Sequence, residues 1–225
     1  MVNLTRIYTR TGDAGSTRLS DMSETRKTDA RVAAYGEVDE ANSVLGLVLL
    51  QPGLPDALAD ALRTIQNELF DLGADLSTPV VPEPAWPPLR IEQASVDRLE
   101  AWCDEFGAGL PALNSFILPG GSPAGAHLHL ARTVVRRAER AAWRAAEQCG
   151  LAAGPDAAPG GVNPLALTYL NRLSDLLFIA SRLVNGVDAE VLWVPGRDRE
   201  PGDERARRQR ARITGQADGT APQAR

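Results

Sequence analysis

The stretch LADALRTIQNELFDLGADL, residues 58–76, decides the fold class. Its apolar positions follow one another at alternating steps of four and three residues: Leu58, Leu62, Ile65, Leu69, Leu72 and Leu76. This spacing draws one apolar stripe along one side of an α-helix, as in a helix of a packed bundle. Pro55 opens the helix and Pro79 closes it, because proline is tolerated in a first helical turn but cannot continue a helix.

Four further segments show helical spacing. The predicted helices run from the N-cap Asp29 to Pro52, from Glu92 to Phe106, from 124 to 148 and from Pro164 to Gly186. The segment 124–148 carries small inner residues such as Ala131 and Ala138, which permit close helix packing. Five helices and no segment of alternating strand pattern predict an all-α fold, a five-helix bundle with ferritin-like up-down packing.

The length and composition of the chain indicate one folded domain with a segment before it and a tail after it. A chain of 225 residues can bury a core without disulfide staples. We expect the bundle to occupy 29–195, after a separate segment at 1–28. The Arg-rich residues 196–225 contain few large apolar side chains, which predicts a disordered tail.

The charge and the cysteines bear on partners and compartment. A net charge of -5 argues against a general nucleic-acid binder. Cys103 and Cys149 lie in no metal-ligand spacing, so no protein metal site is expected. The start of the chain lacks an apolar signal region, and no apolar run reaches the length of a membrane span. These observations predict a cytoplasmic protein without a membrane partner.

The opening segment YTRTGDAGSTRL, residues 8–19, is too polar to build a core. Its hydroxyls, glycines and two arginines suit a loop that cradles a polyphosphate, since glycine-rich turns expose backbone N–H groups. The segment contains no Walker A motif and no G-x-G-x-x-G motif. A turn-rich amino terminus without a ligand explains the same composition, so both interpretations stay open.

Three predicted helices carry polar lines beside their apolar stripes. Arg132, Arg136 and Arg140 recur every four residues and stack along one helical stripe. A solvated face with internal Arg–Glu pairs is one interpretation. Asn171 and Asp39 lie on similar lines of two other helices, so the alternative is a site at which the three lines converge.

Five blocks of sequence, taken together and in order, resemble the PduO-type ATP:cob(I)alamin adenosyltransferases. The blocks are YTRTGDAGSTRL, KTDARVAAYGEVDEANS, FILPGG, LHLARTVVRRAER and NRLSDLLFIASR. The resemblance covers roughly residues 6 to 186. It implies a five-helix bundle that assembles as a homotrimer and binds ATP between neighbouring subunits.

The resemblance implies which residues bind the nucleotide. The motif of the amino-terminal loop matches Thr9, Arg10, Thr11, Gly12, Asp13, Gly15 and Thr17, and a nucleotide-contacting lysine matches Lys27, the one lysine of the chain. The contacts from the adjoining subunit match Arg136, Arg137, Glu139, Arg140 and Asn171. Many relatives carry lysine where this chain has Arg10, which alters the geometry of phosphate binding.

Three further residues receive roles from the resemblance. Asp39 and Arg132 match a carboxylate and an arginine that pair across the subunit interface and support the site. Phe116, in FILPGG, matches an aromatic residue against the lower face of the corrin ring. His127, His129 and the four tryptophans are interpreted as structural residues, because they form no specific constellation.

The implied reaction transfers the 5′-deoxyadenosyl group of ATP to cob(I)alamin, giving adenosylcobalamin and triphosphate. The resemblance implies Mg²⁺ with the ATP, and a four-coordinate cob(II)alamin formed before reduction. A flavin reductase as electron source and a cobalamin-dependent mutase as acceptor of the product stay open as partners. A cobalamin carrier or nucleotide sensor without turnover, and a purely structural bundle, are the competing classes.

Overall fold

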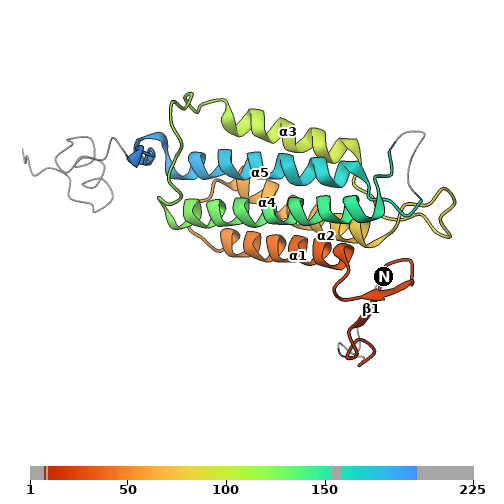
Figure 1. The fold of residues 1–225 in the computed structure, drawn as a ribbon. Coiled ribbons are helices and arrows are strands. Elements are labelled where there is room, and N and C mark those ends of the chain that lie inside the picture. Colours follow the sequence, from red (N-terminus) through yellow and green to blue (C-terminus); the bar gives the residue numbers. More distant parts are fainter. Residues whose placement is uncertain (1–7, 9, 154–158, 197–225) are drawn as a thin grey trace, which may run out of the picture.

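Five α-helices form the body of the chain (Figure 1). The computed structural model describes residues 8, 10–153 and 159–196. The helices are α1 (Ala30–Leu49), α2 (Asp56–Ser77), α3 (Gln93–Gly107), α4 (Pro123–Cys149) and α5 (Pro164–Asn185), followed by the short 3₁₀ helix η1 (Val187–Ala189). The predicted all-α five-helix bundle is therefore confirmed. The predicted tail lies outside the described residues, apart from its first residue.

The helices pack as a four-helix bundle with one helix on its outside. α1 packs against α2 and α4, α4 packs against α5, and α2 also touches α5. α3 packs against α5, and Figure 1 shows it at the edge of the row α3, α5, α4, α1. In this arrangement the outer surface of the α1–α2 pair and that of the α4–α5 pair lie on opposite sides of the bundle.

The core consists of the apolar stripes that the sequence predicts. All six stripe positions of α2, from Leu58 to Leu76, are at most 1% exposed. Each buried leucine contributes about 1.5–3 kcal/mol to the hydrophobic driving force. On α4 the buried inner positions are mainly alanines, such as Ala131 and Ala138, so the backbones of its neighbours can approach closely.

Asp75 of α2 joins three parts of the bundle. Its carboxylate is buried and accepts hydrogen bonds from Ile91 N at 2.8 Å, from Arg90 Nη1 at 2.6 Å and from Asn163 Nδ2 at 2.7 Å. Asn163 is also the N-cap of α5. The end of α2, the approach to α3 and the start of α5 are therefore held by one carboxylate.

A β-hairpin precedes the bundle, where the sequence predicted an irregular loop and no strands. β1 (Ser16–Arg18) and β2 (Glu24–Arg26) are antiparallel, with Thr17 opposite Thr25. Strands of three residues are too short to show a period-two pattern. Ser20 in the turn donates a hydrogen bond from its Oγ to Ser77 Oγ at 3.0 Å, which ties the hairpin to the end of α2.

The N-cap of α1 is confirmed, because the Asp29 carboxylate accepts a hydrogen bond from Arg31 N at 2.8 Å. Among the described helices, none has the length and apolar character that a membrane crossing requires.

Candidate functional site

The hairpin brings Lys27 onto the glycine-rich opening segment. Gly15 N donates to Gly12 O at 3.2 Å, and Lys27 N donates to Gly15 O at 2.9 Å. A Cβ placed on Gly12 would lie 3.2 Å from Lys27 Cε and 3.3 Å from Lys27 Nζ. The ammonium group therefore lies directly against the backbone of Gly12, where a Cβ on residue 12 would require it to shift by a few tenths of an ångström.

The other predicted residues of the opening segment are neighbours of Gly12 in the sequence. Thr11 and Asp13 are exposed, and Arg10 has a left-handed backbone (φ 62°) with its guanidinium carbon 5.6 Å from the centre of the Tyr8 ring. Thr9 lies outside the described residues. The segment thus offers cationic, hydroxyl and backbone N–H groups around one small loop.

Thr17 connects this loop to the bundle. A side-chain hydrogen bond joins Thr17 to Tyr35 of α1. Burial raises the pKa of Tyr35, an effect that the hydrogen bond from Thr17 partly offsets and the charge of Asp29 reinforces. The Tyr35 hydroxyl is therefore neutral at physiological pH and serves as an anchor for the hairpin.

A groove on the α1–α2 surface begins beside the hairpin. Its lining residues are Ser20, Tyr35, Gly36, Val38, Asp39, Asn42, Leu69, Phe70, Gly73, Ala74 and Ser77. Asp39 is exposed in this groove, and Phe70 presents an exposed ring beside it. The interface residue that the resemblance implies therefore lies in an open depression next to the hairpin.

The α4–α5 surface carries most of the second group of predicted residues. Arg136 and Arg140 are exposed, and Arg140 Nη1 donates to Arg136 O at 2.8 Å. Asn171 Nδ2 of α5 donates to Glu139 Oε1 at 3.2 Å. The stripe Arg136, Glu139, Arg140 thus lies beside Asn171, as the helical spacing suggested.

Arg132 belongs to the same surface but is partly buried. Burial, and then the positive charge of Arg136, lower its pKa. Its Nε is buried and has no hydrogen-bond partner among the described residues. Next to it, the buried His129 ring packs edge to face on Phe178 of α5, with ring centres 6.3 Å apart. Arg132 therefore lies on the α4–α5 side and has unused hydrogen-bonding capacity.

Arg137 points elsewhere. Its Nε donates to Glu37 Oε2 at 2.5 Å and its Nη2 donates to Glu40, both on α1. These two hydrogen bonds raise its pKa. Successive helical residues are about 100° apart, so Arg137 faces α1 while Arg136 faces outward. The structure does not bring Arg137 together with the rest of the predicted nucleotide contacts.

Asp39 and Arg132 are on opposite sides of the chain. Asp39 lines the groove between α1 and α2, whereas Arg132 lies beside His129 and Phe178 at the α4–α5 side. One chain does not bring these two side chains together. A pair between them requires two copies of the protein.

Phe116 stands at the far end of the bundle, in the loop before α4. Its ring is 78% exposed and contacts Trp193 edge to face, with ring centres 6.1 Å apart. Trp193 N donates to Phe116 O at 2.7 Å, and Leu118 N donates to Val191 O at 2.8 Å. The sequence analysis interpreted Trp193 as a packing residue. Its pairing with Phe116 was not foreseen, because the two segments are far apart in sequence.

Among residues 8, 10–153 and 159–196, no hydrogen bond or ring contact joins His127 or His129 to Lys27 or to Phe116. His127 Nδ1 lies 2.7 Å from Pro123 O, and His129 is 3% exposed. Burial, and then the charge of Arg132, lower the pKa of His129. Within residues 8, 10–153 and 159–196 there is no group of three or more His, Cys, Asp or Glu side chains placed to hold a metal ion.

Comparison with known proteins adds independent information. Residues 7–184 match the family described as cobalamin adenosyltransferase. The corrinoid adenosyltransferase of Mycobacterium tuberculosis strain H37Rv is 62% identical over 199 residues, which cover 88% of this chain and 97% of the relative. That of Bacillus subtilis strain 168 is 42% identical over 186 residues, covering 80% of this chain and 86% of the relative.

A solved structure matches as well. It is a variant of the PduO-type ATP:corrinoid adenosyltransferase from Lactobacillus reuteri, complexed with cobalamin and ATP. The TM-score is 0.73 at 36% sequence identity, and the match covers 85% of this chain and 99% of that chain.

These matches show that the protein is a transferase. The chain belongs to the cobalamin adenosyltransferase family, in its PduO-type group.

Proposed function

We propose that this chain transfers the 5′-deoxyadenosyl group of ATP to cob(I)alamin and releases triphosphate. The observation that carries the proposal is the Lys27 ammonium packed against Gly12 inside the glycine-rich loop. A compact cation on a glycine-rich turn suits a polyphosphate. The family match over residues 7–184 supports the same reaction.

The opening segment and Lys27 would hold the triphosphate. In the transfer, cobalt(I) supplies the electron pair for a new cobalt–carbon bond at C5′, while the C5′–oxygen bond breaks and the triphosphate leaves with its electrons. The protein needs no nucleophile of its own for this step. Its contribution is to align the two substrates and to neutralise the charge on the leaving group.

The second half of the nucleotide site would come from a neighbouring subunit. Asp39 and Arg132 occupy opposite sides of one chain, so a pair between them makes a head-to-tail contact that can close into a ring. Arg132 has a buried Nε without a partner, which an incoming carboxylate would satisfy. A homotrimer built on this contact would place Arg136, Arg140 and Asn171 near the loop of the next subunit.

The corrin would lie against Phe116. The ring of Phe116 is 78% exposed, far more than a side chain needed only for packing. An apolar ring beneath the corrin would exclude the lower axial ligand of cob(II)alamin. The resulting four-coordinate cobalt accepts an electron more readily, because axial ligands tune the reduction potential of a macrocyclic metal centre.

Mg²⁺ stays a prediction. The described residues hold no cluster of three acidic, histidine or cysteine side chains that would fix a metal by itself. A Mg²⁺ ion would depend on phosphate oxygens and water for most of its ligands, as Mg²⁺ does at many nucleotide sites. No step above is assigned to it. The flavin reductase and the mutase likewise stay predictions.

A direct assay tests the proposal. Protein, ATP and chemically reduced cob(I)alamin are mixed, and the absorbance spectrum of the corrinoid and the amount of triphosphate are followed. We expect adenosylcobalamin and triphosphate in equal amounts. Bound ATP without product would indicate a carrier or sensor, and the absence of both binding and product would indicate a structural bundle.

A further inference from the structure

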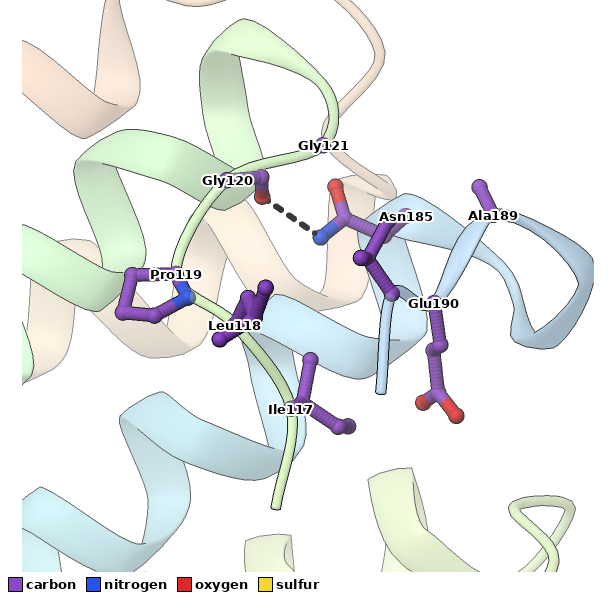
Figure 2. A pocket seen from close by; sticks show the side chains of 9 residues that line it. Ile117, Leu118, Pro119, Gly120, Gly121, Asn185, Ala189 and Glu190 are labelled. Atoms are coloured by element: carbon purple, nitrogen blue, oxygen red, sulfur yellow. Dashed lines mark hydrogen bonds between the residues drawn. The ribbon is translucent and has the colours of Figure 1, made fainter. Parts of the chain in front are cut away.

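Asn185, the last residue of α5, holds the loop that carries Phe116. Figure 2 shows its carboxamide beneath the turn at Gly120 and Gly121, next to a small pocket. Its Oδ1 accepts hydrogen bonds from Ser122 N at 2.8 Å and from Ser122 Oγ at 2.9 Å. Its Nδ2 donates to Gly120 O at 2.9 Å. One side chain therefore binds three groups of the turn.

Two glycines leave room for this carboxamide. A Cβ placed on Gly121 or on Gly125 would overlap the carboxamide atoms of Asn185. Gly121 also has a left-handed backbone, with φ 92°. The amide thus fills the space of two missing side chains, and neither glycine can be enlarged without displacing it.

The other half of the loop is tied to the segment after α5. Leu118 N donates to Val191 O at 2.8 Å, and Trp193 N donates to Phe116 O at 2.7 Å. That segment is itself held by Glu190, whose Oε1 accepts from the buried Arg182 Nε at 2.6 Å. The end of α5 and the residues directly after it therefore fix the loop on both sides of Leu118.

We propose that Asn185 is a positioning residue that sets the place of the Phe116 ring, and through it the exclusion of the lower axial ligand of cob(II)alamin. This inference rests on the proposed function. Loss of the carboxamide removes three hydrogen bonds from the turn that follows Phe116, so the place of the exposed ring then depends on its contact with Trp193 and on the backbone pairing with residues 191–193. The opening hairpin lies at the opposite end of the bundle from the end of α5, so we expect ATP binding not to depend on Asn185 (Figure 1).

The variant Asn185→Ala in the full chain tests the inference with two substrates. With cob(II)alamin and ATP, we expect the fraction of four-coordinate cobalt, measured by electron paramagnetic resonance, to fall roughly tenfold, because a shift of about 1 Å in a positioned group has effects of this size or larger. With pre-reduced cob(I)alamin, the rate and the ATP dissociation constant should change less than about twofold. Four-coordinate cobalt at the wild-type level in Asn185→Ala would overturn the inference.

Gly125→Ala is the matched second variant. Its methyl group would displace the carboxamide of an unchanged Asn185, and alanine is otherwise well accepted in a helix. We expect the same selective loss with cob(II)alamin. In the double variant the methyl group has no carboxamide to strike, so the loss should equal that of Asn185→Ala alone. If the loss in the double variant equalled the sum of the losses in the two single variants, Gly125→Ala would not act through the Asn185 carboxamide and the inference would be contradicted. This comparison holds even where one variant is thermally less stable.

The outcomes separate this inference from the proposed function. A wild-type chain that makes no adenosylcobalamin from cob(I)alamin and ATP would overturn the proposed function and the role of Asn185 with it. An active wild-type chain with an indistinguishable Asn185→Ala variant would overturn the role of Asn185 alone.

Discussion

Arg136 and Arg137 are adjacent in the sequence but have different surroundings. Arg136 is exposed on the α4–α5 side, whereas Arg137 is bound to Glu37 and Glu40 of α1. The sequence motif assigned both to the nucleotide. The helical geometry separates them, because a rotation of about 100° per residue turns the two side chains toward different partners.

This difference gives opposite expectations for the two alanine variants. Arg136→Ala should weaken ATP binding by about 1.5–3 kcal/mol, the range for a charged hydrogen bond. Arg137→Ala should leave ATP affinity nearly unchanged and lower the free energy of unfolding by about 1 kcal/mol or less, because its ion pairs are partly exposed to solvent. Isothermal titration calorimetry and urea denaturation measure the two quantities. An equal loss of ATP affinity in both variants would mean that Arg137 contacts the nucleotide, as the resemblance implies.

The buried His129 ring makes stability depend on pH. Burial and the charge of Arg132 lower its pKa from 6.5, so the folded chain keeps the ring neutral where the unfolded chain binds a proton. The free energy of unfolding should therefore fall as the pH drops below about 6.5. In the His129→Gln variant the free energy of unfolding should depend less on pH, although this variant should be less stable than the wild type at neutral pH. Urea denaturation at several pH values between about 5 and 7 measures the free energy of unfolding, and His127→Gln is the control variant. If the free energy of unfolding of His129→Gln changed with pH as steeply as that of the wild type, this account would be refuted.

At the scale of elements, sequence periodicity was a good guide to the helices. The helix predicted between Pro55 and Pro79 is observed at Asp56–Ser77, and the helix predicted at 124–148 is observed at Pro123–Cys149. Both succeed because burial of one apolar stripe is a local, repeated signal along the chain. The same signal places Arg136, Glu139 and Arg140 on one surface.

The elements that were missed depend on contacts between distant segments. The hairpin at 16–26 has strands of three residues, whose pairing is stabilised by the bundle through Ser20 and Ser77. The segment 191–193 pairs with the Phe116 loop through backbone groups, which leave no pattern in the side chains. The three hydrogen bonds of Asn185 could not be predicted from the sequence either, because they join it to Gly120 and Ser122, more than 60 residues away.

Asp75 gives a test at this scale. Asp75→Ala leaves the donors of Arg90, Ile91 and Asn163 without their buried partner, so the free energy of unfolding should fall by about 3–5 kcal/mol. Asp60→Ala on the same helix removes an exposed carboxylate and should change it by less than about 0.5 kcal/mol. Urea denaturation compares the two. A loss of similar size in both would mean that Asp75 does not join the helices as described.

At the scale of the whole molecule, the α1–α2 side and the α4–α5 side of the bundle carry different parts of the predicted site. The groove with Asp39 and the surface with Arg132 face away from each other, so in the proposed trimer each chain would offer two different halves of a contact. Such a heterologous contact builds rings when its rotation closes. The residues that the resemblance joins in one site are therefore divided between the two sides of a chain.

Charge exchange tests this contact. In the proposed trimer, Asp39→Arg and Arg132→Asp would each place like charges against one another at the interface, so we expect each variant to shift the protein toward monomer. The double variant restores opposite charges in exchanged positions, and we expect it to recover part of the trimer. Sedimentation velocity measures the species present. A trimer that persists in both single variants would show that these residues do not meet.

Subunit mixing tests the shared site most directly. Lys27→Ala lacks the loop cation and Arg136→Ala lacks the stripe cation, so each variant alone should be nearly inactive. In mixed trimers, a site is intact when its loop comes from an Arg136→Ala subunit and its stripe comes from a Lys27→Ala subunit. For random mixing of equal amounts in a head-to-tail ring, about one quarter of the sites are intact, and we predict that share of wild-type adenosylation activity. Activity that stays at the level of the separate variants, in trimers shown by native mass spectrometry to be mixed, would contradict a site shared between subunits.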